Sequence, residues 1–147
     1  MTLLDLQEMS DRIEIQDLLA RYTDAIDRRD WDALDRVFTE DARIDYTAVG
    51  GAAGNLPEIK KFLDDSFKLF ASSQHLIGSS VVDIAGDEAT ARTICHNPMV
   101  FKGGNDPQLL VCGIWYRDRL VRTPQGWRIA ERVEESSYMK EIPAWNK

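Results

Sequence analysis

Apolar residues recur at every third or fourth position in three stretches of the N-terminal half of the chain, which predicts three helices with one buried face each. The first helix follows Ser10, a good N-cap, and reaches Asp27. Asp30 can cap a second, shorter helix, and the third starts at Asn55 with Pro57 in its first turn, where the missing N–H costs nothing. The apolar positions of the three faces are, in order, Ile15, Leu18, Leu19, Tyr22 and Ile26; Trp31, Leu34, Val37 and Phe38; and Ile59, Phe62, Leu63, Phe67 and Phe70.

The period changes to two after the second helix, where Ala42, Ile44 and Tyr46 share one face of a predicted strand. Four later apolar runs, joined by short turns, also predict strands. This order of elements predicts an α+β domain in which an antiparallel sheet curls around the helices. No change in composition divides the chain, so residues 1–147 are expected to form a single domain. The four later runs are 74–84, 89–101, 109–120 and 127–133.

Charge and composition restrict the possible function. Eighteen basic residues against 25 acidic ones give a net charge of -7, so a surface that follows nucleic-acid phosphates is not expected. No apolar run approaches the roughly 20 residues that span a bilayer, and the N-terminus lacks the basic start of a secretory signal. Cys95 and Cys112 lie in apolar strand-like runs, too far apart for a CxxC motif. These features predict a cytoplasmic protein with reduced core cysteines and no membrane association.

Few side chains in the sequence offer chemistry. Metal-ligand spacings, nucleotide-binding glycine motifs and nucleophile elbows are all missing from the sequence, so we expect neither a metal nor a cofactor. Five side chains that can move or hold a proton are expected to face inward: Tyr22, Asp27, Tyr46, His75 and His96.

Asp27 allows two interpretations. It falls in the last turn of the first helix, where the helix dipole disfavours negative charge by up to about 1 kcal/mol, so a partner is expected. Arg28 and Arg29 can provide one at the surface. Alternatively, Asp27 turns inward and orients His75 or His96, which makes that histidine a general base with a fixed tautomer. A histidine without such a partner is more often a hydrogen-bonded core residue.

The chain resembles the SnoaL-like branch of the nuclear-transport-factor-two-like superfamily from Ile15 to about Tyr138. The resemblance rests on the stretch Ile-Gln-Asp-Leu-Leu-Ala-Arg-Tyr, then Asp27, Trp31 and the turn Phe-Thr-Glu-Asp-Ala at residues 38–42. It implies a cone-shaped α+β barrel of the cystatin-like type. In such a barrel, three N-terminal helices and a strongly curved, mixed but mostly antiparallel sheet enclose a deep apolar pocket. One strand pairing is therefore expected to be parallel.

The resemblance also implies roles for the candidate residues. Asp27 and His75 match the catalytic dyad of lyases in this branch, including the separation of 48 residues. Tyr22 matches a tyrosine of bile-acid 7α-dehydratase, and Tyr46 matches a strand tyrosine of that enzyme and of scytalone dehydratase. His96 matches the second histidine of scytalone dehydratase.

Two positions depart from scytalone dehydratase, and a third is ambiguous. Ile26 and Cys112 stand where that enzyme has a tyrosine and a polar amide, so its substrate is not expected here. Arg132 resembles the late-strand arginine of hexachlorocyclohexane dehydrochlorinase, or else it pairs with Glu131 or Glu134.

These residues predict a cofactor-independent lyase of the dehydratase type, in which His75 removes a proton from a small apolar cyclic substrate such as a polyketide or steroid. The alternatives are a ketosteroid-isomerase-like double-bond isomerase and a non-catalytic ligand-binding or dimerisation module of the same fold. An epoxide hydrolase fits less well, because it needs a further water-positioning carboxylate and amide. A homodimer or homotrimer is expected. The residues expected to bind the substrate are Trp31, Phe62, Phe67, Val100, Cys112, Ile114, Trp115 and Arg132.

Overall fold

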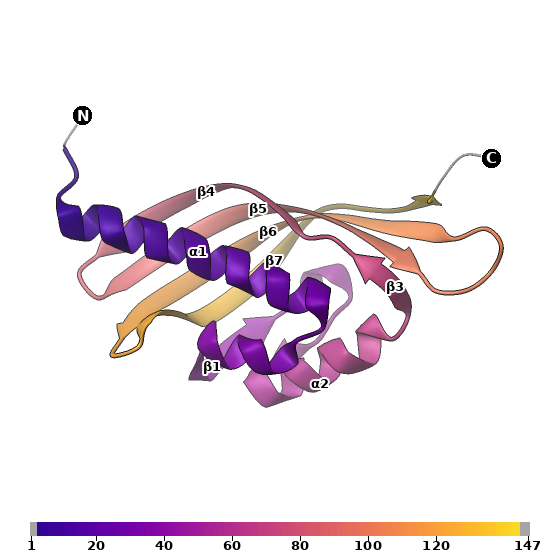
Figure 1. The fold of residues 1–147 in the computed structure, drawn as a ribbon, viewed down its shortest axis with the longest axis horizontal. Coiled ribbons are helices and arrows are strands. Elements are labelled where there is room, and N and C mark those ends of the chain that lie inside the picture. The colour runs from indigo at the N-terminus through magenta and orange to yellow at the C-terminus, as the bar shows by residue number, and fades with distance from the viewer. Residues whose placement is uncertain (1–2, 145–147) are drawn as a thin grey trace.

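The computed structural model describes residues 3–144, in which two α-helices lie against a curled sheet (Figure 1). The helices are α1 (Leu6–Arg28), the 3-10 helices η1 (Trp31–Arg36) and η2 (Thr47–Val49), and α2 (Leu56–Phe67). The strands are β1 (Phe38–Asp45), β2 (Ala53–Gly54), β3 (Phe70–Ser73), β4 (Leu76–Ala85), β5 (Glu88–Phe101), β6 (Gln108–Thr123) and β7 (Gly126–Pro143).

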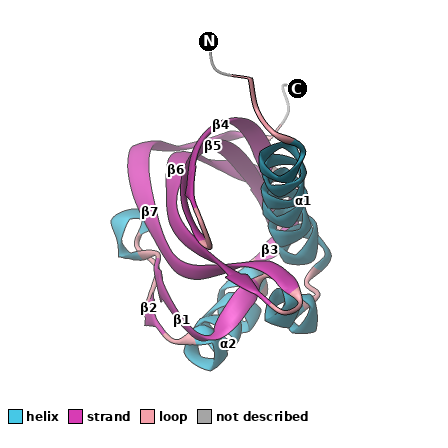
Figure 2. Cartoon of the chain, turned by 90° about the vertical axis from the view of Figure 1, so that its left-hand side faces the viewer, coloured by secondary structure: helices cyan, strands magenta, loops and turns pink. Residues whose placement is uncertain are grey.

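Seven strands form one mixed sheet in the order β2-β1-β7-β6-β5-β3, and β4 also pairs with β5. β1 runs parallel to β7 and the other described pairings are antiparallel, so the pattern-based expectation of a purely antiparallel sheet is wrong. Register shifts interrupt four of the ladders, and such bulges bend strands and increase their twist. Figure 2 shows the resulting half-barrel with α1 along its open side. The predicted α+β class, with a curled mixed sheet and few helices, is confirmed.

α1 forms because its apolar face is buried against the sheet, which supplies most of the stability of such a helix. It begins before the predicted start: the Asp5 carboxylate accepts a hydrogen bond of 2.7 Å from the Glu8 amide, so Asp5 rather than Ser10 is the N-cap. The predicted apolar face is confirmed, since all five of its members are buried: Ile15, Leu18, Leu19, Tyr22 and Ile26.

The second predicted helix is the 3-10 helix η1. Asp30 caps it as expected, accepting a hydrogen bond of 3.1 Å from the Ala33 amide. Phe38, predicted on its apolar face, instead opens β1 opposite Ile129, because pairing with β7 ends the helical stretch.

α2 starts at the predicted position. Asn55 accepts a hydrogen bond from the Glu58 amide at 3.0 Å, and the Glu58 carboxylate accepts one from the Asn55 amide at 2.9 Å, which completes a capping box. The helix ends at Phe67. Phe70, expected on its apolar face, therefore lies in β3 opposite Phe101.

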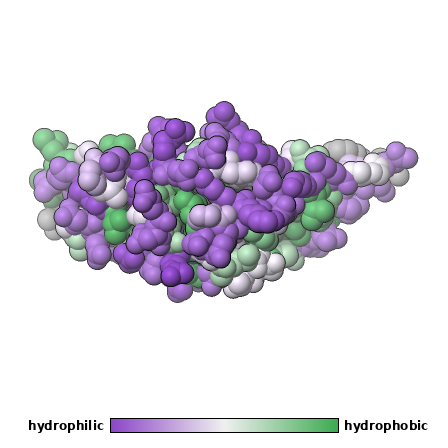
Figure 3. All heavy atoms as spheres, turned by 90° about the horizontal axis from the view of Figure 1, so that it is seen from below, coloured by the Kyte–Doolittle hydropathy of each residue, from purple (hydrophilic) through white to green (hydrophobic). Residues whose placement is uncertain are grey.

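β7 continues well past Val133, where its apolar pattern ends, and reaches Pro143 opposite Gln108 of β6. Backbone pairing with β6, rather than alternating hydrophobicity, sets its length. The face seen from the α2 side is mostly hydrophilic, with small separate groups of hydrophobic side chains (Figure 3). Among residues 3–144, no helix is long and apolar enough to cross a membrane.

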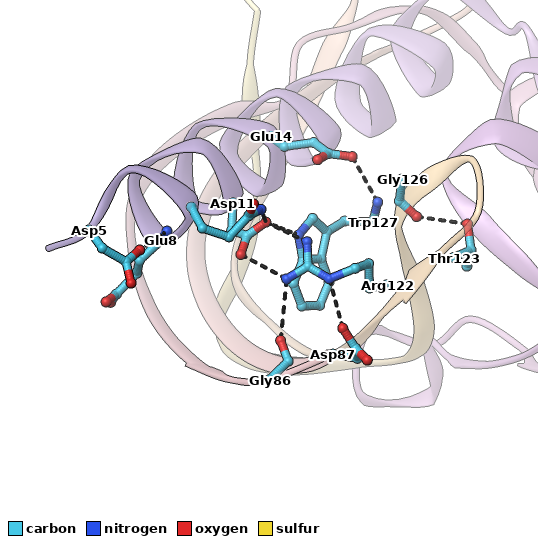
Figure 4. A network of polar contacts seen from close by, with 11 residues as sticks. Asp5, Glu8, Asp11, Glu14, Gly86, Asp87, Arg122, Thr123, Gly126 and Trp127 are labelled. Carbon is cyan, nitrogen blue, oxygen red and sulfur yellow. Dashed lines mark hydrogen bonds and ion pairs between the residues drawn. The ribbon is translucent and has the colours of Figure 1, made fainter.

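Asp11 ties the N-terminal half of α1 to two strand turns (Figure 4). Its carboxylate accepts hydrogen bonds from both terminal nitrogens of Arg122, at 2.6 and 2.8 Å, and from the Trp127 indole at 3.0 Å. Arg122 reaches on to Asp87 at 2.9 Å, and Glu14 accepts from the Trp127 amide at 2.8 Å. These contacts fix one end of α1 over the edge of the half-barrel.

Candidate active site

A cavity of about 230 Å³ lies between α1, α2 and the inner face of the sheet. Its wall is mostly apolar and carries a small number of polar groups, as is typical of sites for small molecules. The lining residues are Tyr22, Ile26, Tyr46, Val49, Gly50, Gly51, Phe62, Leu63, Ser66, Phe67, Phe70, His75, Asn97, Met99, Leu110, Cys112, Ile114 and Glu134.

His75, immediately before β4, contacts Asp27 at the end of α1. The imidazole Nδ1 lies 2.6 Å from Asp27 Oδ1, and the His75 amide donates to Asp27 Oδ2 at 2.8 Å. The imidazole is 5% exposed and stacks on Phe67, with ring centroids 6.4 Å apart. The inward interpretation of Asp27 therefore describes its geometry, and the two residues are in direct contact.

Arg29 and Ser73 brace this pair from behind. Ser73 Oγ donates to Asp27 Oδ1 at 2.9 Å and accepts from Arg29 Nη1 at the same distance. Arg29 has a left-handed backbone, with φ at 60°, because it is the C-cap of α1. Arg28 forms an ion pair with Asp24 at 3.3 Å, so neither arginine binds the Asp27 carboxylate, and that surface interpretation is wrong.

The environment keeps Asp27 ionised. Burial raises the pKa of its carboxyl group, but the hydrogen bonds and charge interaction from His75 and the hydrogen bond from Ser73 together lower it below the ordinary value. An ionised carboxylate at this position accepts a hydrogen bond from Nδ1–H, which leaves the lone pair on Nε2. Nε2 makes no hydrogen bond to any of residues 3–144, so it is free to accept a proton from a molecule in the cavity.

Tyr22 and Tyr46 stand together in the cavity wall, with their hydroxyl oxygens 2.7 Å apart. Burial raises the pKa of Tyr22 to about 12 and that of Tyr46 well above its ordinary value, so both phenols are neutral. One hydroxyl donates to the other, which leaves the second proton of the pair for another acceptor.

Arg132 does not present an unpaired charge to the cavity. Its guanidinium forms two hydrogen bonds of 2.7 Å with Asp118 and lies 4.0 Å from the ring centroids of both Tyr22 and Tyr116. The expected pairing with Glu131 or Glu134 is not found, because Glu131 pairs with Arg119 at 2.9 Å. Arg132 therefore supports the tyrosine from behind.

His96 and Trp115 point away from the cavity. Side chains alternate between the two faces of a strand, and their neighbours Asn97 and Ile114 are the ones that face inward. His96 is exposed, with Nδ1 2.9 Å from the Tyr138 hydroxyl, and Trp115 lies under the Arg92 guanidinium at 3.8 Å. The structure thus separates His96 from His75.

Of the remaining residues predicted to bind the substrate, some line the cavity and others do not. Trp31 donates to Asp64 at 3.1 Å and packs on the outer side of Phe67, while Val100 is not part of the cavity wall. The cavity wall includes four of the predicted binding residues: Phe62, Phe67, Cys112 and Ile114. Burial raises the pKa of the Cys112 thiol to about 11 and that of the Cys95 thiol to about 12, and both cysteines are free and buried.

Sequence reasoning missed two buried polar residues of the wall, Asn97 and Glu134. Both are buried, and Asn97 Oδ1 has no hydrogen-bond partner among residues 3–144. Burial raises the pKa of Glu134 to about 8, against the lowering effect of Arg132, so its carboxyl group is largely protonated at neutral pH. The inward position of Asn97 follows from alternation along β5, so the sequence did carry that signal.

Gly51 belongs to the loop that closes the cavity beside Tyr46. A Cβ at this position would lie 2.8 Å from the Tyr46 Cβ and 2.9 Å from its carbonyl oxygen, closer than such atoms approach. The Gly51 amide donates to that same oxygen at 3.0 Å. Glycine is therefore needed to hold the tyrosine in the wall.

A larger and more open hollow of about 790 Å³ lies elsewhere on the sheet. It is lined by exposed charged side chains such as Arg43, Arg117 and Arg119 and includes neither His75 nor Asp27. We place the candidate active site in the smaller cavity, because that is where the paired histidine and the buried polar groups meet.

This fold and site belong to a class of small curled-sheet domains with an internal apolar pocket. The chain belongs to the SnoaL-like domain family, whose model matches residues 7–133. It is 50% identical to the uncharacterized protein Rv2910c of Mycobacterium tuberculosis over 139 residues, which is 95% of this chain and 94% of that protein.

Solved structures show the same architecture. A nuclear-transport-factor-two-like protein with a cystatin-like fold from Novosphingobium aromaticivorans is 28% identical, with a TM-score of 0.67 over 90% of this chain and 85% of that one. A hexachlorocyclohexane dehydrochlorinase (LinA) of type 2 is 18% identical, with a TM-score of 0.83 over 98% of this chain and 97% of that one. At this identity, the second likeness concerns the fold.

Proposed function

We propose that the protein is a cofactor-independent lyase of the dehydratase type that acts on a small cyclic ketone or related carbonyl compound. The observation that carries this proposal is that His75, which lines a mostly apolar cavity, is held by Asp27 with Nδ1 2.6 Å from the carboxylate. A base that is held by a carboxylate and lies in the wall of an apolar pocket suits the removal of a proton from carbon. The dehydrochlorinase of the same fold is named for an elimination as well.

In the proposed reaction, His75 Nε2 removes the proton beside the carbonyl group of the substrate. The charge that develops on the imidazole is stabilised by the ionised Asp27, which also holds the ring in place. Placement of such a base typically contributes about 10² to 10⁴ in rate. The neutral pair Tyr22 and Tyr46 offers a proton to the enolate oxygen as charge moves there.

The size of the cavity narrows the substrate class. Its volume of about 230 Å³ is below the roughly 300–1,000 Å³ of pockets for drug-sized ligands. One or two rings therefore suit the pocket better than the four rings of a steroid. Contacts with Phe62, Phe67 and Ile114 favour an apolar ring system.

An isomerase that shifts a double bond is the second candidate, because the same base and the same tyrosine pair serve that reaction when the substrate carries no leaving group. An epoxide hydrolase is less suitable, although the cavity does contain a carboxyl group and an amide. Activation of water requires an ionised carboxylate, whereas burial holds Glu134 in its protonated form up to a pH of about 8.

The test compares wild type with His75→Ala on 3-hydroxycyclohexanone and 3-hydroxy-1-tetralone, with formation of the unsaturated product followed by absorbance. Cyclohexanone in D₂O, followed by NMR, reports proton removal without elimination. We expect wild type to accelerate elimination, and His75→Ala to lose both activities while its circular dichroism is unchanged. Exchange into cyclohexanone without elimination of either hydroxy ketone would favour the isomerase, and activity retained in His75→Ala would reject the base.

A further inference from the structure

We infer that Glu134 is a second catalytic residue, a general acid that donates its proton to a hydroxyl group leaving the substrate, with Asn97 as the acceptor that orients that hydroxyl. The inference rests on the proposed elimination and deepens it, because it assigns an oxygen rather than a halide as the leaving atom. Glu134 lies on β7 and His75 precedes β4, and both line the cavity of about 230 Å³. A cavity of this size holds one small molecule, which can therefore meet both side chains.

The position of Glu134 is unusual for a carboxyl group. It is 7% exposed and makes no hydrogen bond to any of residues 3–144, whereas the neighbouring Glu131 and Glu135 form ion pairs at the outer face. A buried carboxyl group without a partner is costly when it is ionised, so the folded protein favours the neutral acid. The neutral acid has one proton to donate and only the contents of the cavity to receive it.

Groups from several elements influence this carboxyl. Arg132 on the same strand favours ionisation, and the carboxylates of Asp45 and Asp118 oppose it. The remaining titratable groups that interact with Glu134 are neutral at physiological pH: Tyr22, Tyr46, Cys95, Cys112 and Tyr116. Arg132 forms two hydrogen bonds with Asp118, and its Nη1 forms none with any of residues 3–144. Burial decides the protonation state.

Asn97 supplies an independent observation. Its side chain is 5% exposed and lines the same cavity, yet Oδ1 has no hydrogen-bond partner among residues 3–144. A buried amide oxygen without a donor is destabilising, so the site is suited to a ligand that brings a donor. A substrate hydroxyl donates to Asn97 Oδ1 through its hydrogen and accepts a proton from Glu134 on its oxygen. A halide has no hydrogen to donate to Asn97, and it leaves as a stable anion that needs no proton from Glu134.

These groups account for every proton and electron pair in the proposed reaction. His75 Nε2 takes the proton from the carbon beside the carbonyl, and the electron pair of that C–H bond forms the new carbon–carbon double bond. The carbon–oxygen bond at the next carbon breaks, and the Glu134 proton completes a water molecule. Imidazolium and carboxylate remain, and a proton passes from His75 to Glu134 through the released water. This assignment of acid and base follows the general pattern in which environments keep one group protonated and another free.

The first experiment compares leaving groups on one ring, 3-hydroxycyclohexanone and 3-chlorocyclohexanone, in wild type, His75→Ala, Glu134→Gln and the matched control Glu135→Gln. Glu135 is adjacent but faces outward. Glutamine keeps the shape of Glu134 and cannot give up a proton. We expect Glu134→Gln to lose about 10²-fold or more in turnover of the hydroxy compound and to process the chloro compound nearly as wild type does. Glu135→Gln should match wild type on both.

The second experiment measures binding of 1-tetralol, which offers a hydroxyl oxygen to Glu134 and has no carbonyl group for the tyrosine pair, by calorimetry between pH 6 and 9.5. Wild type should bind about tenfold more weakly at pH 9 than at pH 7, because only the protonated form of Glu134 donates to the hydroxyl oxygen. Glu134→Gln keeps an N–H donor, so its affinity should not change with pH. This readout depends on the proton and not on the fold.

The two experiments separate the two proposals. Equal turnover in wild type and His75→Ala, or no turnover of either compound by wild type, overturns the proposed function, and 1-tetralol still decides whether Glu134 donates to a hydroxyl oxygen. Loss of turnover in His75→Ala, combined with an equal effect of Glu134→Gln on both leaving groups, overturns the general acid alone. Absence of 1-tetralol binding at pH 6, or affinity in wild type that does not change with pH, also overturns it.

Discussion

α1 carries a carboxylate near each end, Asp11 and Asp27, and the two are used differently. Asp11 is surrounded by donors that are always protonated: the Arg122 guanidinium holds both of its oxygens, and the Trp127 indole adds a third hydrogen bond (Figure 4). Asp27 is held by Ser73 and His75 instead. The Asp11 network is closed, whereas at Asp27 the last partner is a histidine that lines the cavity and whose second nitrogen makes no hydrogen bond to any of residues 3–144.

The difference shows that a buried, ion-paired carboxylate does not by itself indicate an active site. Both carboxylates have lowered pKa values, Asp11 mainly through its hydrogen bond to Arg122 and Asp27 through His75 and Ser73 working against burial. The titratability of the partner and its access to a cavity distinguish the two sites. The Asp11 network should therefore affect stability, and the Asp27 site should affect rate.

The largest expected effect is at the open end of α1. His75→Ala should reduce turnover by about 10² to 10⁴-fold because it removes the base. Asp27 keeps its hydrogen bonds from Ser73 and the backbone of residue 75, so the fold should persist. Turnover of the hydroxy ketones and thermal unfolding check this together. If His75→Ala lost thermal stability to the same degree as turnover, His75 would have a structural role like that of Asp11, and the comparison would fail.

At the closed end, Asp11→Ala should destabilise the protein by about 2–4 kcal/mol, in or just below the range for breaking a buried ion pair, because Arg122 is partly exposed and keeps Asp87. Urea unfolding measures this loss, and turnover per folded molecule should be unchanged. The contribution of Asp11 is complete above its ordinary pKa of 3.8 and is lost as the pH falls below that value. A stability difference that does not shrink in acid would contradict the pairing.

The contribution of Glu134 to stability also depends on pH, but in the opposite direction to that of Asp11. The folded protein keeps the Glu134 proton up to a pH of about 8, while the unfolded chain releases it near its ordinary value of 4.5. Stability therefore falls as the pH rises through that window, by about 1.4 kcal/mol per pH unit at most. Glu134→Gln should remove this slope, so the variant gains on wild type between pH 6 and 8. Parallel stability curves in urea would show that Glu134 is ionised when folded.

The smallest effect is expected at Ser73, which supports the Asp27 carboxylate. Ser73→Ala removes one of the hydrogen bonds to Asp27 and one of the three acceptors of Arg29 Nη1, and should cost about 1 kcal/mol in stability. Turnover should fall by about tenfold or less, since His75 still holds the carboxylate. Comparing kcat with KM tests whether Ser73 orients the base through Asp27. Loss of an orienting residue lowers kcat, whereas a change confined to KM would place Ser73 in contact with substrate.

Helical periodicity predicted much of the fold, because burial of one face is the force that forms these helices. The apolar positions of α1 and the cap at Asn55 follow from the sequence directly. The extent of β7 beyond Val133 did not, since it depends on pairing with β6. The cut-off between α2 and β3 at Phe70 also depends on a partner strand.

The site was predictable only in part. Asp27 and His75 were identified through resemblance, because no local pattern reveals a contact across 48 residues. The predicted inward positions of His96 and Trp115 are wrong, because side chains alternate along β5 and β6 and the neighbours Asn97 and Ile114 face the cavity. Simple alternation along β7 does not predict that Glu134 faces inward. The register shift between β6 and β7 buries both Ile129 and Ala130, so the inward positions after Ala130 are displaced by one residue.

The account depends most directly on the tautomer of His75. Long-range ¹H–¹⁵N correlation spectra of the imidazoles, recorded where the rings are neutral and assigned with His96→Gln, report which nitrogen carries the proton. We expect wild type to show His75 protonated at Nδ1 and unprotonated at Nε2, and Asp27→Asn to lose this preference. A His75 ring protonated at Nε2 in wild type would contradict the account, because the nitrogen that faces the substrate would then have no lone pair for its proton.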